Sequence, residues 1–449
     1  MSPGRDLVAV YLRWIFARAV LHRGWWLVTS VYLVVESGLS PAELVFIGVA
    51  QGVISLLFEV PAGVIADTVS RRTSLIVSHV LMGTAMLATG LVTDFWLIVA
   101  TQMLWGLSWT FASGADVAWL TDELDGAYGD HSHRSAAGGL TGIGSRCSDV
   151  AGGPAATDGP SAGGGRPRPP EAATPERGGW PSVSTVLVRA GRAELIGSAV
   201  GLVVIGGLGS LLPRGIAMVI AGGAMLALGL YVVLRFGERN FTPATERRWA
   251  ASWQILRDGI KLVRASRAIL VMFAATFLVN GADNTARLFQ KRLVDLGFPS
   301  SPVLWFTLLG VLTLLVGSLV LRLVEGRVDT AGGAVRCYAL ACAAGVVGFA
   351  AFAFVPEELS GSAAFILVAG IAMPMTRVIG VIWVNRETTG NVRATVHSFL
   401  AQAEYLGEIV VGFGIAAVAR FAGLPAALVV SAAVIVVTIG VISRARTQP

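Results

Sequence analysis

Residues 63–72, GVIADTVSRR, join two long apolar stretches of the chain. Asp67 falls near a helix end, where its carboxylate can accept hydrogen bonds from Arg71 or from backbone N–H groups at a neighbouring helix N-terminus. Arg71 and Arg72 favour water or lipid headgroups, which predicts that this turn lies on the cytoplasmic side of a membrane. An ordinary positive-inside turn would explain the two arginines. It would not explain Gly63 and Asp67 at these offsets.

Apolar residues dominate the composition of the 449-residue chain: 54% of its residues are hydrophobic and only 14% are charged. Soluble proteins carry about 25% charged residues, and a helix that crosses a bilayer needs about 20 apolar residues. The composition therefore predicts an all-α integral membrane protein. Twelve apolar spans are predicted, at 7–36, 41–66, 74–93, 95–121, 184–211, 214–236, 267–290, 302–324, 331–355, 361–384, 394–419 and 423–443.

Arginine placement supports this number of spans. Arginines cluster in every second loop and at both termini, whereas the alternate loops carry few. This alternation requires an even number of spans with both termini in the cytoplasm. The net charge of +6 thus belongs to cytoplasmic loops and does not indicate a nucleic-acid partner. The clustered arginines are Arg5, Arg71, Arg72, Arg134, Arg146, Arg166, Arg168, Arg177, those of 235–267, Arg322, Arg327, Arg386, Arg393, Arg444 and Arg446.

The loop at 237–266 divides the spans into two groups of six, which predicts an N-terminal bundle, 1–236, and a C-terminal bundle, 267–449. Apolar residues recur at helical spacing within this loop with basic residues between them. The pattern predicts an amphipathic helix, either on the cytoplasmic membrane surface or packed against cytoplasmic loops. Residues 126–182 have too few large apolar residues to bury a core, so we predict a disordered cytoplasmic loop between spans four and five. A reading-frame slip would give the same composition.

The segment 63–72 resembles the signature loop of the major facilitator superfamily, G-x-x-x-D-x-x-x-R-[RK], and lies between the second and third spans as in that family. FEVPA at 58–62, WLTDE at 119–123 and RATVHS at 393–398 resemble bacterial drug-efflux-type members. The resemblance covers the chain outside 126–182 and implies two six-helix bundles. It also implies a latch between the two halves on the cytoplasmic face, formed by Gly63, Asp67, Arg71 and Arg72.

Three positions depart from the family pattern. The family's fourth-span arginine corresponds here to Gln102. On the fifth span, Gly197 and Gly201 favour close helix packing, but the glycine–proline pair of antiporters is missing. The second copy of the loop motif, at 317–327, has no aspartate. The first two departures weaken the expectation of proton antiport and leave the predicted fold unchanged.

Ionisable side chains within the spans are candidate site residues, because each costs about 2.5–3.5 kcal/mol at the centre of a bilayer. On the first span, Arg18 and His22 share one face and Arg23 lies close to it. A helix that begins later would place all three at the membrane interface instead. On the seventh span, Asp283 and Arg287 are one turn apart and can neutralise each other.

Glu404 and Glu408 are one turn apart on the eleventh span. If both face the interior, their repulsion should leave one of them protonated, as proton coupling requires. Structural ion pairs with Arg377 and another base are the alternative. Trp105 and Trp109 on the fourth span can stack on an aromatic substrate or act as packing residues. The family resemblance implies a central cavity lined by spans one, four, seven and ten, which hold Arg18, Arg23, Asp116, Asp283, Arg287 and Arg377.

The leading functional hypothesis is a secondary active transporter that exports a small, partly apolar compound by proton antiport. Metabolite uptake or facilitated diffusion is the alternative. A polytopic membrane enzyme is more distant, because the predicted external loops are short and the sequence has no P-loop or HExxH motif. A non-transporting sensor, the other distant alternative, would keep the fold but lose the mobile carboxylates. Cys147, Cys337 and Cys342 lack disulfide or metal-ligand spacing, so no cofactor or metal is predicted. We expect a monomer in the bacterial inner membrane, with a small-molecule substrate, protons and lipid as partners.

Overall fold

The computed structural model describes residues 3–126, 182–243, 267–297, 301–328, 330, 332–387 and 390–444. Regular structure in this part of the chain is entirely helical. The helices are α1 (Pro3–Val35), α2 (Pro41–Thr68), α3 (Arg71–Thr89), α4 (Phe95–Ala112), residues 115–126, α6 (Val183–Leu211), α7 (Arg214–Arg235), α9 (Arg267–Asp283), η1 (Asn284–Ala286), α10 (Arg287–Leu296), α11 (Pro302–Val328), α12 (Gly333–Phe354), α13 (Glu358–Phe365), η2 (Ile366–Ala372), α14 (Met373–Glu387) and α15 (Gly390–Ser443).

Polar caps and glycine determine where several helices begin and end. Ser40 and Glu43 form a reciprocal capping box at the start of α2, with backbone-to-side-chain distances of 2.8 and 3.3 Å. Asp94 accepts from two backbone N–H groups at the start of α4. Gly297, with a φ of 93°, ends α10, because glycine adopts a positive φ at little cost.

Nine helical stretches among the described residues are long and apolar enough to cross a membrane. The prediction of a multi-pass membrane protein is therefore confirmed. α1 and α3 occupy predicted spans but are not among the nine, and α15 covers two predicted spans that join at Gly423, where φ is 84°. The count of twelve stays a prediction.

Three of the predicted spans are interrupted helices. The fourth span breaks at Ser113 and Gly114, whose φ is 73°, and continues through residues 115–126. The seventh passes from α9 through the 3₁₀ turn η1 into α10 and extends beyond its predicted end. The tenth contains the π-helical stretch η2 between α13 and α14. Such π-helical turns are frequent at functional sites.

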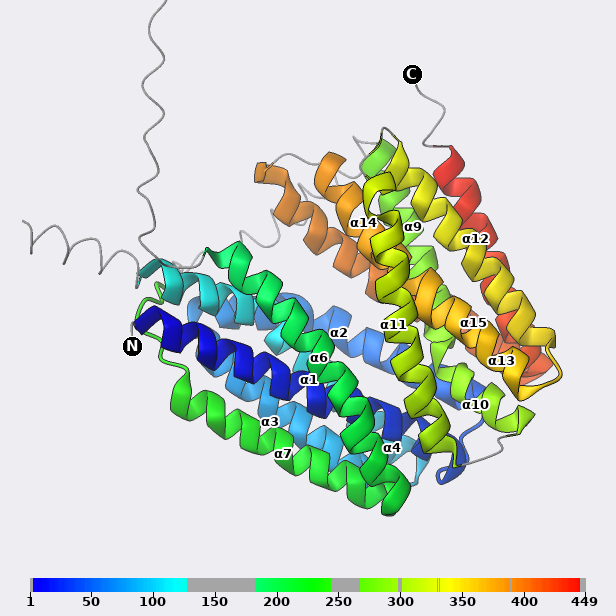
Figure 1. The fold of residues 1–449 in the computed structure, drawn as a ribbon, viewed down its shortest axis with the longest axis horizontal. Helices are drawn as coiled ribbons and strands as arrows, with labels where there is room; N and C mark the ends of the chain where they lie inside the picture. The colour runs from blue at the N-terminus through cyan, green and yellow to red at the C-terminus, as the bar shows by residue number, and fades with distance from the viewer. Residues whose placement is uncertain are drawn as a thin grey trace, which may run out of the picture.

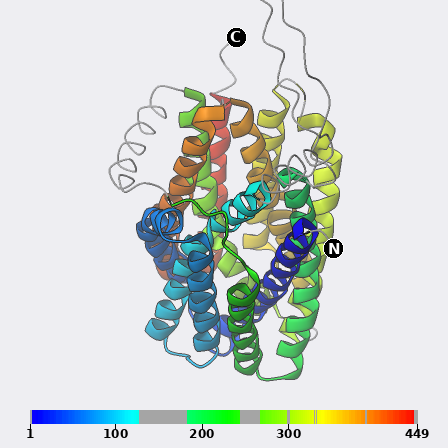
Figure 2. The ribbon, with the colours of Figure 1, turned by 90° about the vertical axis from the view of Figure 1, so that its left-hand side faces the viewer.

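Helix pairing follows the same pattern in two groups, α1–α7 and α9–α15 (Figures 1 and 2). In the first group α1 packs along α6, and α3 packs along α7. In the second, α9 and α12 pack along successive parts of α15. The groups meet where α2 contacts α15 and where α6 contacts α11.

The two groups are spread apart at the end where the chain termini lie and converge at the opposite end (Figure 1). Where α6 contacts α11, Thr307 near the start of α11 donates a hydrogen bond to the carbonyl oxygen of Leu202 of α6, 3.4 Å away. The molecule therefore has one joined end and one separated end.

Several sequence predictions lie outside the described residues. They include nearly all of the predicted disordered loop at 126–182 and the part of 237–266 that holds the predicted amphipathic helix. The side chains of residues 390–395, which include Arg393, are also outside the described set. The residue boundaries of the two predicted bundles stay a prediction.

Candidate functional site

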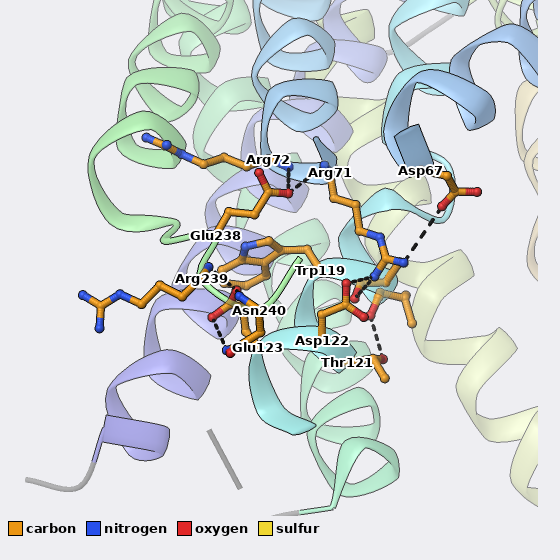
Figure 3. Close-up of polar contacts among 12 residues, drawn as sticks. Asp67, Arg71, Arg72, Trp119, Thr121, Asp122, Glu123, Glu238, Arg239 and Asn240 are labelled. Carbon is orange, nitrogen blue, oxygen red and sulfur yellow. Dashed lines mark hydrogen bonds and ion pairs between the residues drawn. The ribbon is translucent and has the colours of Figure 1, made fainter. Parts of the chain in front are cut away.

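The first turn of α3 is held by a glutamate from the segment that follows α7 (Figure 3). The carboxylate of Glu238 accepts hydrogen bonds from the backbone N–H groups of Arg71, at 2.8 Å, and Arg72, at 3.2 Å, and from the Ser70 hydroxyl. A helix N-terminus has unpaired N–H groups and a partial positive charge, so a carboxylate is favourable there. Our sequence analysis missed Glu238, although an acidic residue in an arginine-rich loop was a usable signal.

The guanidinium of Arg71 faces two carboxylates and a carbonyl oxygen (Figure 3). Its Nη1 donates to Asp122 and to the Ala118 carbonyl oxygen, the latter at 2.7 Å. Its Nη2 lies 3.9 Å from the Asp67 carboxylate. Arg72 instead donates to a backbone carbonyl of α7. The contact expected between Asp67 and Arg71 is present, but Asp122 is the nearer partner.

A second carboxylate binds the segment after α7 to the end of the helix at 115–126 (Figure 3). Glu123 accepts hydrogen bonds from the backbone N–H groups of Arg239 and Asn240, at 2.7 and 3.0 Å. The indole N–H of Trp119 donates to the carbonyl oxygen of Gly237 at 2.9 Å. We call the whole set the loop cluster: Asp67, Ser70, Arg71, Arg72, Asp122, Glu123 and Glu238.

The contacts described for Arg71 and Arg72 all lie within residues 63–243, which belong to the first group of helices. A role of this turn as a latch between the halves therefore stays a prediction. Gly63 has open space around it in this conformation, because no heavy atom of another described segment lies within 4 Å of the place where a Cβ would stand.

A cavity of about 390 Å³ lies between the two groups of helices. Its volume is within the range of small-molecule sites. Residues from α1, α2, α4 and α6 form one side, and residues from α9 to α11 and α13 to α14 form the other. Of the predicted site residues, those that line this cavity are Arg23, Asp283, Arg287 and Arg377, and those that do not are Arg18, His22, Asp116, Glu404 and Glu408.

An ion pair in the cavity wall joins Asp283 of α9 to Arg377 of α14, with 3.4 Å between the charged atoms. Arg287 has other partners. It donates to the side chain of Gln51, and its guanidinium lies 5.2 Å from the ring centroid of Trp26. The counter-ion of Asp283 is thus a residue of another helix, rather than the arginine one turn away.

A buried polar chain continues from Arg287 into the first group of helices. Gln51 donates to Gln102 at 3.0 Å, and Gln102 donates to the Thr89 hydroxyl at 3.2 Å. Gln102 is 0% exposed, and it stands where the family resemblance places an arginine. A neutral amide satisfies this buried position through hydrogen bonds alone.

Glu404 lines a second, smaller cavity of about 130 Å³ within the second group of helices. Asp283 and Arg377 line both cavities, so their ion pair lies where the two adjoin. Within the described part of the chain, neither Glu404 nor Glu408 forms an ion pair, so the expected alternative of a pair with Arg377 is not found.

Two further hydrogen bonds join the groups of helices. The hydroxyl of Tyr405 donates to the Glu59 carboxylate at 3.3 Å, and the amide of Asn284 donates to the Val45 carbonyl oxygen at 3.5 Å. Ser113, at the break that follows α4, also donates to Glu59, at 3.1 Å.

Arg18 and His22 form a separate cluster in the first group of helices. Arg18 lies 3.7 Å from the Asp116 carboxylate and 4.8 Å from the ring centroid of Trp109. His22 stacks on Trp105, with 5.5 Å between the ring centroids. Neither tryptophan lines either cavity, which favours the packing interpretation. α1 begins at Pro3, well before these residues, and their depth in the membrane stays a prediction.

No protein-family model matches the chain, and no curated protein sequence matches it. Several solved structures, in contrast, are similar to the chain. The nucleoside transporter NupG is 14% identical, with 99% of this chain and 100% of that chain covered and a TM-score of 0.72. The human organic anion transporter MFSD10 (TETRAN) is 16% identical, with coverage of 98% and 100% and a TM-score of 0.54. A bacterial homolog of the human lysosomal transporter Spinster, in an inward-facing and occupied conformation, is 12% identical, with coverage of 100% and 98% and a TM-score of 0.66.

These similarities extend over nearly the whole chain. The chain therefore shares its fold with these solved transporter structures. The resemblance to drug-efflux-type members in particular is not shown.

Proposed function

We propose that this protein is a secondary transporter in which two helix bundles, 1–236 and 267–449, move relative to each other and expose a central cavity alternately to the two sides of the membrane. The observation that carries this proposal is the cavity of about 390 Å³ whose walls come from both groups of helices. The joined and separated ends of the two groups support it, because alternating access requires one end to open while the other closes.

The orientation follows from the arginine alternation, which predicts cytoplasmic termini. In that orientation the separated end faces the cytoplasm of a bacterial cell, and this conformation is inward-open. When the outward-open conformation forms, the separated ends meet, and the loop cluster with Gly63 then acts as the predicted latch. The protein works as a monomer in this proposal.

Export of a small, partly apolar compound in exchange for protons is the favoured mode. It is supported by Glu404 and Glu408, which lie in α15 without an ion pair among the described residues. A carboxylate in the membrane is costly when it is charged and uncompensated, and protonation removes that cost. Such a group can bind a proton from one side and release it to the other.

Uptake or facilitated diffusion of a metabolite is the second candidate. Gln102 favours it, since a neutral buried amide replaces the fourth-span arginine of the family pattern. The similar structure described as a nucleoside transporter also fits a metabolite as the substrate.

Proton flux in proteoliposomes separates the two modes. A pH-sensitive dye is trapped inside the vesicles, and nucleosides, dipeptides, aromatic acids and aromatic amines are supplied outside. Antiport predicts that at least one compound changes the internal pH and that Glu404→Gln abolishes the change. Glu325→Gln, on the exposed side of α11, is the matched control. Transport without any change in internal pH would contradict antiport and leave facilitated transport.

A further inference from the structure

The charges that line the central cavity are unequal in number. Three arginines, Arg23, Arg287 and Arg377, face it, and Asp283 is the only acidic residue in its wall as described. Asp283 already has Arg377 as its counter-ion at 3.4 Å. The described wall of the cavity therefore carries an excess of positive charge.

Arg23 is the cation with the least compensation. Among the described residues it has no hydrogen bond or ion pair, whereas Arg287 is held by Gln51, by Asn284 and by the face of Trp26. An uncompensated guanidinium within the membrane is costly, and a planar oxyanion that binds its fork-shaped donors removes that cost.

The other residues that line the cavity indicate the shape and polarity of the rest of the ligand. Large apolar side chains surround the arginines, so they suit a compact aromatic or aliphatic body. Thr29, 2% exposed, also lines the cavity, and its hydroxyl has no hydrogen-bond partner among the described residues. It follows Arg23 by six residues on α1, a rise of about 9 Å. The apolar lining residues that suit such a body are Trp26, Leu33, Leu44, Phe289, Phe306 and Phe365.

We propose that the substrate is an amphipathic organic anion whose oxyanion binds Arg23 and Arg377 and whose apolar body lies among the aromatic residues of the cavity. This substrate class rests on the proposed transport function. Asp283 competes with the ligand for Arg377, so binding of the anion releases Asp283 from its ion pair. Because Asp283 also lines the smaller cavity beside Glu404, this release links the substrate to the carboxylates of the second group of helices.

Equilibrium dialysis with two probes of nearly equal shape tests the charge preference. The probes are 2-naphthoate, an anion, and 2-naphthamide, its neutral isostere, with the purified full-length protein in detergent at constant ionic strength. We expect the anion to bind at least ~10-fold more tightly, because charge-assisted hydrogen bonds are stronger than neutral ones. Equal affinities, or no saturable binding of the anion up to its solubility, would overturn the proposal.

Substitutions of Arg23 and of Asp283 should change anion binding in opposite directions, which a general loss of structure would not do. Arg23→Gln should abolish the preference for the anion, and Arg23→Lys should retain part of it. Arg13→Gln, at an exposed position of the same helix, is the control and should change nothing. Asp283→Asn should strengthen anion binding, because Arg377 loses its competing partner. Weaker anion binding in Asp283→Asn, with an unchanged melting temperature, would refute the competition.

An incorrect substrate class and an incorrect transport function would give different experimental results. If the bundles exchange between two conformations while the amide binds as well as the acid, the transporter assignment stands and the substrate class is wrong.

Discussion

At the scale of single residues, charge is compensated by contacts between segments that are far apart in the sequence. Glu238 accepts from three donors at the start of α3, and Asp283 meets Arg377 across the cavity wall. Arg23 has no such compensation among the described residues. The contacts of Glu238 and the Asp283–Arg377 ion pair stabilise the fold. Arg23 is the residue for which we propose a ligand as the partner.

Glu238→Gln should destabilise the protein by about 1 kcal/mol, because the neutral amide weakens charge-assisted hydrogen bonds and the interaction with the helix N-terminus. Thermal unfolding in detergent measures the change. The exposed Glu325→Gln variant is the control, since it removes the same charge outside the loop cluster. Equal shifts in the two variants would show that Glu238 has no special role at the start of α3.

Gly63→Leu should leave the melting temperature unchanged, because no atom lies near its Cβ position in this conformation. It should nevertheless slow transport, since a large side chain would prevent the halves from meeting at the separated end. Gly191→Leu on α6, also with nothing within 4 Å, is the matched control for the flux assay. Wild-type transport by Gly63→Leu would refute the latch.

At the scale of helices, glycine permits the closest contacts in both groups. A Cβ on Gly197 of α6 would lie 2.6 Å from the carbonyl oxygen of Phe16 of α1, and one on Gly281 of α9 would lie 2.8 Å from that of Gly407 of α15. Real Cβ atoms do not come this close. The close packing predicted for Gly197 is therefore present, and glycine permits equally close packing of α9 and α15 in the second group.

Gly407→Ala should cost about 1–3 kcal/mol of stability, because the added methyl group overlaps the backbone of α9 and separates two packed helices. Gly414→Ala lies two turns further along α15 with open space around it, so it should be nearly neutral. The difference between their melting temperatures is the measurement. Equal melting temperatures would contradict the close contact of α9 and α15.

At the scale of the whole molecule, the sequence allowed prediction of the features that the bilayer requires of each segment on its own. Span length and arginine alternation are such constraints, and helices cover the predicted spans. The pairing of Asp283 with Arg377, or of Glu238 with α3, depends on how distant helices pack. Spacing along one helix suggested only Arg287 as the neighbour of Asp283. The break at Gly114 depends on a positive φ, which an apolar pattern does not report.

In the proposed transport cycle, the two groups of helices exchange between two arrangements. Val69, at the end of α2, and Leu323, near the end of α11, are 61% and 60% exposed and belong to different groups at the separated end. Spin labels at these two positions, in a variant whose three cysteines are replaced by alanine, report their distance by pulsed electron paramagnetic resonance. Labels at Val69 and Val188, both in the first group, give the control distance.

The measurement is made in lipid nanodiscs at acidic and at neutral pH, with and without 2-naphthoate. We expect two distances for the Val69–Leu323 pair, a long one that matches this conformation and a shorter one whose population changes with the conditions. The Val69–Val188 distance should stay constant. A single, unchanging Val69–Leu323 distance under every condition would contradict alternating access.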